Sequence, residues 1–338
     1  MNTVLLAGDV GGTNTRLALY ARGDAGEDTG LECQVLRSFA SDSEATLEAI
    51  IQRFLAKEAA GRTVAAACFG VPGPVLKGTV RLTNLPWHME ENSLSKALGI
   101  DRVRLVNDHV ATAAALPLLN GPDLLPLYAG NEERERHTFA ILAPGTGLGQ
   151  ACLHVDAQGR LHPIASEGGH VAFSPTCEIQ VALLNYVRRK LERRVSYEQI
   201  LSGAGIQAIY AFLRDSGRWD EPAALREELK SAADRAAMIS EHALKASYPI
   251  CVRTMDIFAA ILGARAGDLV LNYLATGGIF LGGGISQKIA EYLRQGCMLD
   301  AYRDKGRLSY LVEATPLSII MHEHPAVLGA AAIAWDLC

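Results

Sequence analysis

The sequence lacks any long run of Lys and Arg, and its formal net charge is −5 with a pI of about 6.0. A nucleic-acid binder needs a positive field to neutralise phosphates, so we expect no nucleic-acid partner. No uncharged apolar stretch reaches the ~18 residues that suggest a membrane span. The longest candidate, 269–285, is shorter and rich in glycine. We therefore expect no membrane partner either.

The sequence also lacks a CxxC pair: its seven cysteines are odd in number and widely spaced. This pattern favours reduced thiols in a cytoplasmic protein over a disulfide framework. His170 and Cys177 together do not supply the four ligands of a structural zinc site. The N-terminal residues have no basic region and only a short apolar run, which predicts no signal peptide. We expect a cytoplasmic protein.

The chain has 338 residues, of which 49% are hydrophobic and 20% charged, enough for two folded domains. Short apolar runs and a helical apolar pattern alternate in the first part. Ser41 and Glu44 suggest a capping box at the start of the first helix, and Gly61 its end. Gly99 marks the end of a second helix. Strands are predicted at 4–7, 17–20, 32–39, 64–69 and 103–106, and the second helix at 93–98.

A change in composition at 118–137, towards Pro, Gly, Asn and charge, predicts a crossover between domains. The order strand, glycine turn, strand then restarts, which hints at an internal duplication. Most of 177–275 is predicted to be helical. The elements expected around it are strands at 138–142, 150–155 and 317–321 and helices at 287–294 and 325–335.

The first glycine turn, residues 8–13, lies between two predicted strands. A Rossmann fingerprint needs a helix after the glycines, so this is a different motif. Glycines let the backbone N–H groups approach an anion, and Thr13 and the following Asn14 add donors. Asp9 beside a phosphate site suggests Mg²⁺ between them, directly or through water. The alternative is a tight hairpin that Asp9 caps, but the full DVGGTNTR string favours a phosphate site.

Two further glycine turns follow. The second, residues 145–149, has the form of a glycine-rich hairpin that could hold the β- or γ-phosphate. The third, residues 277–286, lies after a buried strand and before a helix, where small residues allow a nucleoside to pack and the helix offers free N–H groups. Each turn alone also fits an ordinary structural turn. Three such turns in one chain are more informative about function than any single one.

Polar residues between the turns suggest a polyol site. Asn107 and Asp108 end a predicted strand, and ligands of α/β sheets lie at such ends. Asp108 could take a proton from a sugar hydroxyl, or simply cap a helix. Glu167 and His170 are separated by two glycines, which lets both side chains reach one small ligand. Glu198 is a third candidate, although a helix dipole could equally explain this acid.

Taken together, these residues resemble the bacterial glucokinase family of the hexokinase–actin–sugar kinase superfamily. The matching motifs run in family order over nearly the whole chain. They are GDVGGTNTR at 8–16, TNLPW at 83–87, VNDH at 106–109, PGTGLG at 144–149, EGGHVAF at 167–173, LSGAG at 201–205, GGIFLGGGI at 277–285 and PAVLGAA at 325–331.

The resemblance implies an α/β, two-domain actin-like (ribonuclease H-like) ATPase fold with a cleft between the domains. The small domain would comprise 1–118 plus 322–338, and the large domain 119–321 with helical insertions. The implied reaction is phosphorylation of glucose at the 6-hydroxyl by Mg-ATP, with Asp108 as general base. The implied partners are glucose, ATP and Mg²⁺, and the implied assembly is a homodimer.

The resemblance also assigns residues to ligands. Those implied to bind glucose are Asn84, Asn107, Asp108, Glu167, His170 and Glu198. Those implied to bind ATP are Gly8, Asp9, Val10, Gly11, Gly12, Thr13, Gly145, Thr146, Gly147, Gly282, Gly283 and Gly284. Mg²⁺ would be carried by ATP, near Asp9.

The sequence departs from the related ROK sugar kinases, which carry a CxCGxxGCxE zinc motif after a similar His. Here 171–178 reads VAFSPTCE, and no N-terminal helix-turn-helix is present, so a zinc-free kinase is favoured over a ROK-type repressor. The residues leave open another hexose, such as fructose or mannose, and another donor, such as ADP or polyphosphate. They also leave open an actin-like nucleotide-dependent regulatory protein, although such a protein has no need of a polyol pocket.

Overall fold

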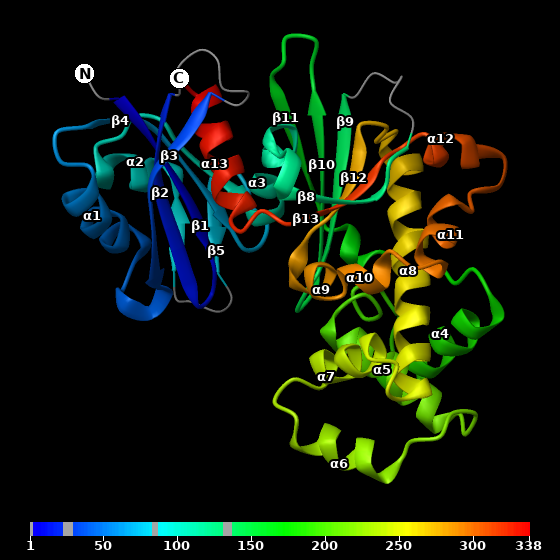
Figure 1. Ribbon diagram of the computed structural model, residues 1–338. Coiled ribbons are helices and arrows are strands. Elements are labelled where there is room, and N and C mark those ends of the chain that lie inside the picture. The colour runs from blue at the N-terminus through cyan, green and yellow to red at the C-terminus, as the bar shows by residue number, and fades with distance from the viewer. Residues whose placement is uncertain (1–2, 23–29, 83–86, 131–136) are drawn as a thin grey trace. The chain divides into compact units, whose positions relative to one another are not determined.

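The computed structural model describes residues 3–22, 30–82, 87–130 and 137–338 (Figure 1). Its contacts divide the chain into two compact units. The first consists of Met1–Asp123, Ala151–Ala165 and His322–Cys338, and the second of Leu124–Gln150 and Ser166–Met321. Compared with the division expected from the sequence, the first unit extends to Asp123 and also takes in 151–165.

The first unit contains a five-stranded sheet in the order β3-β2-β1-β4-β7. Its strands are β1 (Thr3–Val10), β2 (Asn14–Arg22), β3 (Leu31–Ala40), β4 (Thr63–Val71) and β7 (Val103–Asn107). β1 is antiparallel to β2 but parallel to β4, which is in turn parallel to β7. The five predicted strands are confirmed. A two-stranded sheet of β5 (Thr79–Arg81) and β6 (His88–Glu90) was not expected.

The described helices of this unit are α1 (Leu47–Glu58), α2 (Glu91–Leu98), α3 (Asp108–Ala115) and α13 (Pro325–Asp336), with short 3₁₀ turns at Ser41–Ser43, Leu116–Leu118 and Gly121–Asp123. The predicted capping box is wrong, because Thr46 caps α1 by accepting from the N–H of Ala49. Gly99 ends α2 in the left-handed conformation, as predicted.

The C-terminal helix α13 packs against α3, β1 and β4, which lie far from it in the sequence (Figure 1). The contact with α3 is close: a Cβ on Gly329 would lie 1.7 Å from the carbonyl oxygen of Ala111. Small residues let the two backbones approach. The last helix of the chain is therefore part of the first unit's core.

A six-stranded sheet follows in the order β11-β10-β9-β12-β13-β8. Its strands are β8 (Leu124–Tyr128), β9 (Thr138–Pro144), β10 (Leu148–Val155), β11 (Leu161–Ser166), β12 (Gly278–Leu281) and β13 (Leu317–Ile320). The first five positions repeat the pattern of the other sheet: three consecutive strands, then two later ones. This confirms the predicted duplication. The strands β8 and β11 were not expected.

The second unit carries the remaining helices. They are α4 (Glu178–Leu191), α5 (Gly203–Asp215), α6 (Ala223–Ser231), α7 (Arg235–Leu244), α8 (Pro249–Tyr273), α9 (Gly283–Lys288), α10 (Ala290–Leu293), α11 (Cys297–Arg303) and α12 (Ser309–Glu313). The helical stretch within 177–275 is confirmed. The single helix predicted at 287–294 is wrong, since α9 begins at Gly283 and α10 follows it separately.

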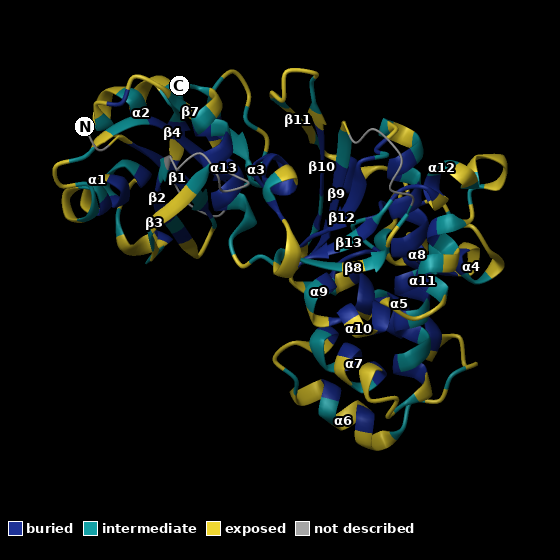
Figure 2. Ribbon diagram, turned by 45° about the horizontal axis from the view of Figure 1, so that its top comes forward, coloured by how far each residue is buried: buried dark blue, intermediate teal, exposed yellow. Residues whose placement is uncertain are grey.

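The long helix α8 forms the centre of the second unit's core. It is apolar almost all round and buried along most of its length, as expected of a helix enclosed by others (Figure 2). The strands β9 and β12 and the helices α5, α7 and α11 pack against it. None of the helices in the described ranges, α8 included, is both long enough and apolar enough to span a membrane.

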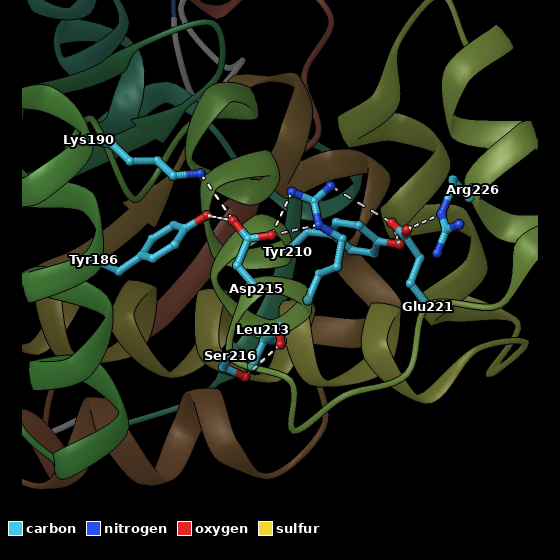
Figure 3. Close-up of polar contacts among 9 residues, drawn as sticks. Tyr186, Lys190, Tyr210, Leu213, Asp215, Ser216, Glu221 and Arg226 are labelled. Atoms are coloured by element: carbon cyan, nitrogen blue, oxygen red, sulfur yellow. Dashed lines mark hydrogen bonds and ion pairs between the residues drawn. The ribbon is translucent and has the colours of Figure 1, made fainter.

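A network of ion pairs joins α4 to α5 and to the segment before α6 (Figure 3). Asp215, the last residue of α5, accepts from the hydroxyl of Tyr186 and from Lys190 of α4. Arg214 donates to Asp215 at 2.8 Å. The hydrogen bond from Tyr186 lowers the pKa of Asp215 to about 2, with further lowering by Arg214 and Lys190. The charged carboxylate therefore stabilises this helix junction.

We expect Asp215→Asn to lower the free energy of unfolding by about 1 kcal/mol at pH 7, an estimate reduced for solvent screening. The folded-state pKa is depressed, so the stabilisation is present above about pH 4 and is lost as the pH falls towards 2. Urea unfolding of the parent and of Asp215→Asn at pH 7, 4 and 3 measures the difference in their free energies of unfolding. This difference should become smaller as the pH falls. The exposed Asp220→Asn is the control and should show no such pH dependence. A pH-independent difference would contradict the role given to the charge.

Candidate functional site

The first glycine turn connects β1 to β2 and is braced by Ser41. The N–H of Gly11 donates to the carbonyl of Asn14 at 2.9 Å. The Ser41 hydroxyl donates to the Gly11 carbonyl at 2.7 Å, and the Ser41 N–H donates to the Thr13 carbonyl at 2.8 Å. The buried hydroxyl of Thr15 lies 2.9 Å from that of Ser41. The turn is thus held from within, and its exposed tip offers N–H groups to an anion.

Asp9 lies beside this turn and is largely buried. Arg16, its cross-strand neighbour in β2, donates to it at 3.2 Å. Burial raises the pKa of Asp9, the positive charge of Arg16 opposes the rise, and the negative charge of Asp108 adds to it. Asp9 and Asp108 are therefore within electrostatic reach of each other in the first unit.

The strand register explains why these two carboxylates meet. The parallel strands β1, β4 and β7 align Asp9 with Gly70, and Gly70 with Val106, so Asp9 and Asp108 lie at one edge of the sheet. Gly70 also sets the spacing. A Cβ there would lie 3.1 Å from the Cβ of Ala111 and 3.5 Å from the Cα of Asp108. A side chain at position 70 would require α3 to move by a few tenths of an ångström.

At the start of α3, Asn107 and not Asp108 is the N-cap. The side-chain oxygen of Asn107 accepts from the N–H of His109 at 3.0 Å, and its amide donates to the carbonyl of Gly73 at 3.2 Å. Asp108 is the first residue of α3, and its Oδ1 also accepts from His109, at 2.9 Å. The second carboxylate oxygen, Oδ2, remains on a side chain that is about a third exposed. Asp108 can therefore act on a ligand.

The second glycine turn connects β9 to β10. The N–H of Gly145 donates to the carbonyl of Gly147 at 2.8 Å, and Thr146 at the tip is exposed. Glu198 supports the turn, because its Oε2 accepts from the N–H of Leu148 at 3.1 Å. A Cβ on Gly147 would lie 2.6 Å from this oxygen. A larger residue at position 147 would therefore displace the Glu198 carboxylate from the turn.

Three predicted residues come together in the second unit as a polar cluster: Glu167, His170 and Glu198. The His170 ring lies 3.9 Å from Oε2 of Glu167 and 3.8 Å from Oε1 of Glu198. His170 and Glu198 also line a polar pocket of about 310 Å³. The cluster offers several hydrogen-bond acceptors and an imidazole ring, which suits a ligand with several hydroxyl groups.

Residues 278–281 of the third predicted turn form β12, so the turn itself is 282–284, which follows β12 and opens α9. Gly283 has φ +75°, and a Cβ there would lie 2.3 Å from the carbonyl oxygen of Pro144, so only glycine fits. Gly284 lines a cavity of about 580 Å³ together with Gly145 and Thr146. The second and third turns therefore border one cavity of the second unit. Its charged lining residues are Asp234, Glu241 and Lys288.

One residue implied to bind glucose, Asn84, lies outside the described residues. The other predicted residues fall into two sets, one in each unit. The first unit holds 8–13, Asn107 and Asp108. The second holds 145–147, 282–284 and the polar cluster.

The glucokinase family model matches residues 6–337. The chain belongs to the glucokinase family. It is 36% identical to a curated glucokinase of Nostoc punctiforme over 343 residues, which cover 97% of this chain and 98% of that protein. It is therefore an enzyme of this family, as the resemblance implied.

Solved glucokinase structures share the fold. The crystal structure of a glucokinase from an Antarctic psychrotroph has a TM-score of 0.87 at 30% identity, over 98% of this chain and 99% of that one. A ROK family glucokinase from Streptomyces griseus, in complex with glucose and AMPPNP, has a TM-score of 0.60 at 20% identity, over 98% and 99% of the two chains. The predicted actin-like ATPase fold is confirmed.

Sequence patterns did not identify all the residues that hold this family's motifs in place. Ser41 was interpreted as a helix cap, yet it binds the first turn. Gly70 lies in an apolar strand with no motif around it, and only the strand register shows its role. Gln150, behind the polar cluster, is 2% exposed. A buried polar residue on a strand could have been noticed as an exception to the apolar pattern.

We expect Ser41→Ala to lower the free energy of unfolding by about 1–3 kcal/mol, because it leaves the buried Thr15 hydroxyl and the Gly11 carbonyl without their partner. Urea unfolding followed by circular dichroism measures this loss. The exposed Ser38→Ala on β3 is the matched control and should stay within ~0.5 kcal/mol of the parent. Equal effects of the two changes would show that Ser41 does not brace the turn.

Proposed function

We propose that the chain transfers the γ-phosphoryl group of ATP to the 6-hydroxyl of glucose. The observation that carries the proposal is the polar cluster, in which two carboxylates lie within 4 Å of one imidazole. A nucleotide-binding fold alone does not need such a cluster, whereas a sugar requires acceptors and donors for its hydroxyl groups. The Streptomyces griseus neighbour, solved with glucose and AMPPNP, supports the same pair of ligands.

In this proposal Asp108 is the general base. It accepts the proton of the 6-hydroxyl as that oxygen attacks the γ-phosphorus; the new O–P bond forms while the bond to ADP breaks. Oδ2 of Asp108 has no hydrogen-bond partner among the described residues, and this together with the partial exposure of the side chain supports the role. Asn107 and the polar cluster would hold the sugar.

ATP would be held by the glycine turns. The first and second turns would receive its phosphates through backbone N–H groups. The cavity of about 580 Å³ bordered by Thr146 and Gly284 is of the size that small-molecule sites usually have, and would take the nucleoside. Magnesium would arrive as part of the Mg-ATP substrate. Asp9 fits it as a carboxylate whose buried charge a cation would offset, directly or through water.

We expect Asp108→Asn to lower kcat by ~10²–10⁴-fold while leaving glucose affinity within a few-fold, because the base is lost and the shape is kept. The amide oxygen of Asn can still accept from His109, so α3 should remain intact. Steady-state kinetics and glucose titration calorimetry separate the two quantities. The exposed Asp101→Asn is the control. A near-normal kcat for Asp108→Asn would refute the assignment.

A panel of hexoses and donors decides between the alternatives. We expect glucose with ATP to give the highest kcat/KM. Fructose and mannose serve as other acceptors, and ADP and polyphosphate as other donors. A coupled assay for ADP follows the ATP reactions, and direct detection of the sugar phosphate follows the rest. A higher kcat/KM with another hexose or donor would replace glucose or ATP in the proposal.

We also propose that the enzyme is a cytoplasmic homodimer, as its family resemblance implies. Light scattering coupled to size-exclusion chromatography tests the assembly. The mass expected is twice that of one chain, and the mass of a single chain would refute the dimer.

A further inference from the structure

Arg265 is a cation in the middle of α8 that is only 6% exposed. No ion pair reaches it within the described part of the chain. Its Nη2 donates to the side-chain oxygen of Gln150 at 2.8 Å, and its guanidinium lies over the ring of Tyr197, 4.8 Å from the centroid. Its Nε has no hydrogen-bond partner among the residues that the structure describes. A buried charge without a counter-ion costs stability, and an apolar residue is often at least as stable there. Stability alone therefore does not account for Arg265.

The arginine fixes the orientation of Gln150. A guanidinium only donates, so the oxygen of the Gln150 amide must face Arg265 and its nitrogen must face away. That nitrogen donates to the hydroxyl of Ser166 at 3.2 Å and to that of Tyr273 at 3.1 Å. A reversed amide would lose the hydrogen bond to Arg265, because its nitrogen and the guanidinium are both donors, and the two hydroxyls would then have to donate to the amide oxygen. Arg265 thus determines where Gln150 presents its donors.

The Ser166 hydroxyl connects the Gln150 amide to the turn that carries Glu167 and His170. This hydroxyl accepts from the N–H of Gly168 at 3.0 Å. Gly168 also packs directly against the Gln150 amide, since a Cβ on Gly168 would lie 2.3 Å from the Gln150 side-chain oxygen. The turn that carries Glu167 and His170 is therefore in contact with the side chain that Arg265 orients.

Tyr197, the other contact of Arg265, supports the remaining member of the cluster. The N–H of Tyr197 donates to the carbonyl of Val171 at 3.1 Å, and the next N–H, that of Glu198, donates to the carbonyl of Gly169 at 2.9 Å. Both bonds join the Glu198 segment to the Glu167–His170 turn. The two neighbours of Arg265 thus hold the two parts of the cluster.

We propose that Arg265 is a positioning residue for the polar cluster, holding the Gln150 amide and the Tyr197 ring so that Glu167, His170 and Glu198 face one sugar. The inference rests on the proposed role of this cluster in binding glucose. Arg265 touches no substrate. Its planar fork donates to Gln150 and stacks on Tyr197 at once, which an ammonium group cannot reproduce.

The first test replaces Arg265 with Met, which removes the charge and keeps most of the volume. We expect the KM for glucose to rise by about tenfold or more, because a misplaced binding group loses its contacts. The KM for ATP should change less than threefold and the melting temperature should not fall. Arg265→Lys should give an intermediate KM. The control Arg253→Met lies on the same helix, at a partly exposed site, and should change neither KM.

A second pair of variants tests the connection from Gln150 through Ser166 to Gly168 and leaves the buried charge of Arg265 in place. Ser166→Ala removes the link from Gln150 to Gly168, whereas Tyr273→Phe removes the other acceptor of the same Gln150 nitrogen and leaves this connection intact. We expect a raised glucose KM for Ser166→Ala and an unchanged one for Tyr273→Phe. If Arg265→Met fails to fold, this pair still decides. Equal effects of the two changes would overturn the inference.

Glu167→Gln, measured alongside, separates this inference from the proposed function. If Glu167→Gln raises the glucose KM while Arg265→Met and Ser166→Ala do not, the function stands and the positioning role is wrong. If Arg265→Met lowers stability and kcat together with an unchanged glucose KM, its role is structural and the inference is overturned. If Glu167→Gln leaves the glucose KM unchanged, the glucose-binding role of the cluster fails and the inference falls with it.

Discussion

The parallel register of β1, β4 and β7 is the constraint on which the first half of the site depends. It brings the end of β1, with Asp9, and the start of α3, with Asp108, to one edge of a sheet. Because side chains alternate between faces along a strand, a slip of one residue would turn Asp9 to the opposite face. The glycine at position 70 keeps the spacing without adding a side chain. Backbone pairing, rather than any contact between functional groups, thus sets the geometry.

In the second unit a single carboxylate connects two functions. One oxygen of Glu198 holds the N–H that follows the second glycine turn, and the other lies near the ring of His170. A movement of the turn therefore displaces the polar cluster as well. If phosphates bind at the turn and sugar at the cluster, the two ligands are coupled through one side chain, and each should influence the affinity of the other.

Local chemistry explains what could be predicted from the sequence. Glycine turns between apolar runs identified β1, β2, β9 and β10, and the repeated order of strands pointed to duplication. The strands β8 and β11 were missed because each contains a proline, Pro126 and Pro163, which weakens a strand pattern. Both lie at the edges of the sheet, where a strand tolerates proline.

The candidate residues with motifs around them were also found from sequence, and the polar cluster brings three of them together. Their supports were not found. Gln150 and Arg265 are far apart in the chain, and nothing in the local sequence of either predicts that they meet. Ser41 showed a valid local pattern, but the first turn competes for its hydroxyl and Thr46 takes over the cap. Contacts between residues far apart in the sequence therefore determine both the Gln150–Arg265 pair and the role of Ser41.

The position of α13 has a consequence for synthesis of the chain. This helix is made long after α3 has left the ribosome, yet α3 packs against it through Gly329 and Ala111. Until then, α3 can pack only against partners made earlier, such as β4 and β7, and lacks its contact with α13. The core of the first unit is therefore completed only after α13 has been synthesised.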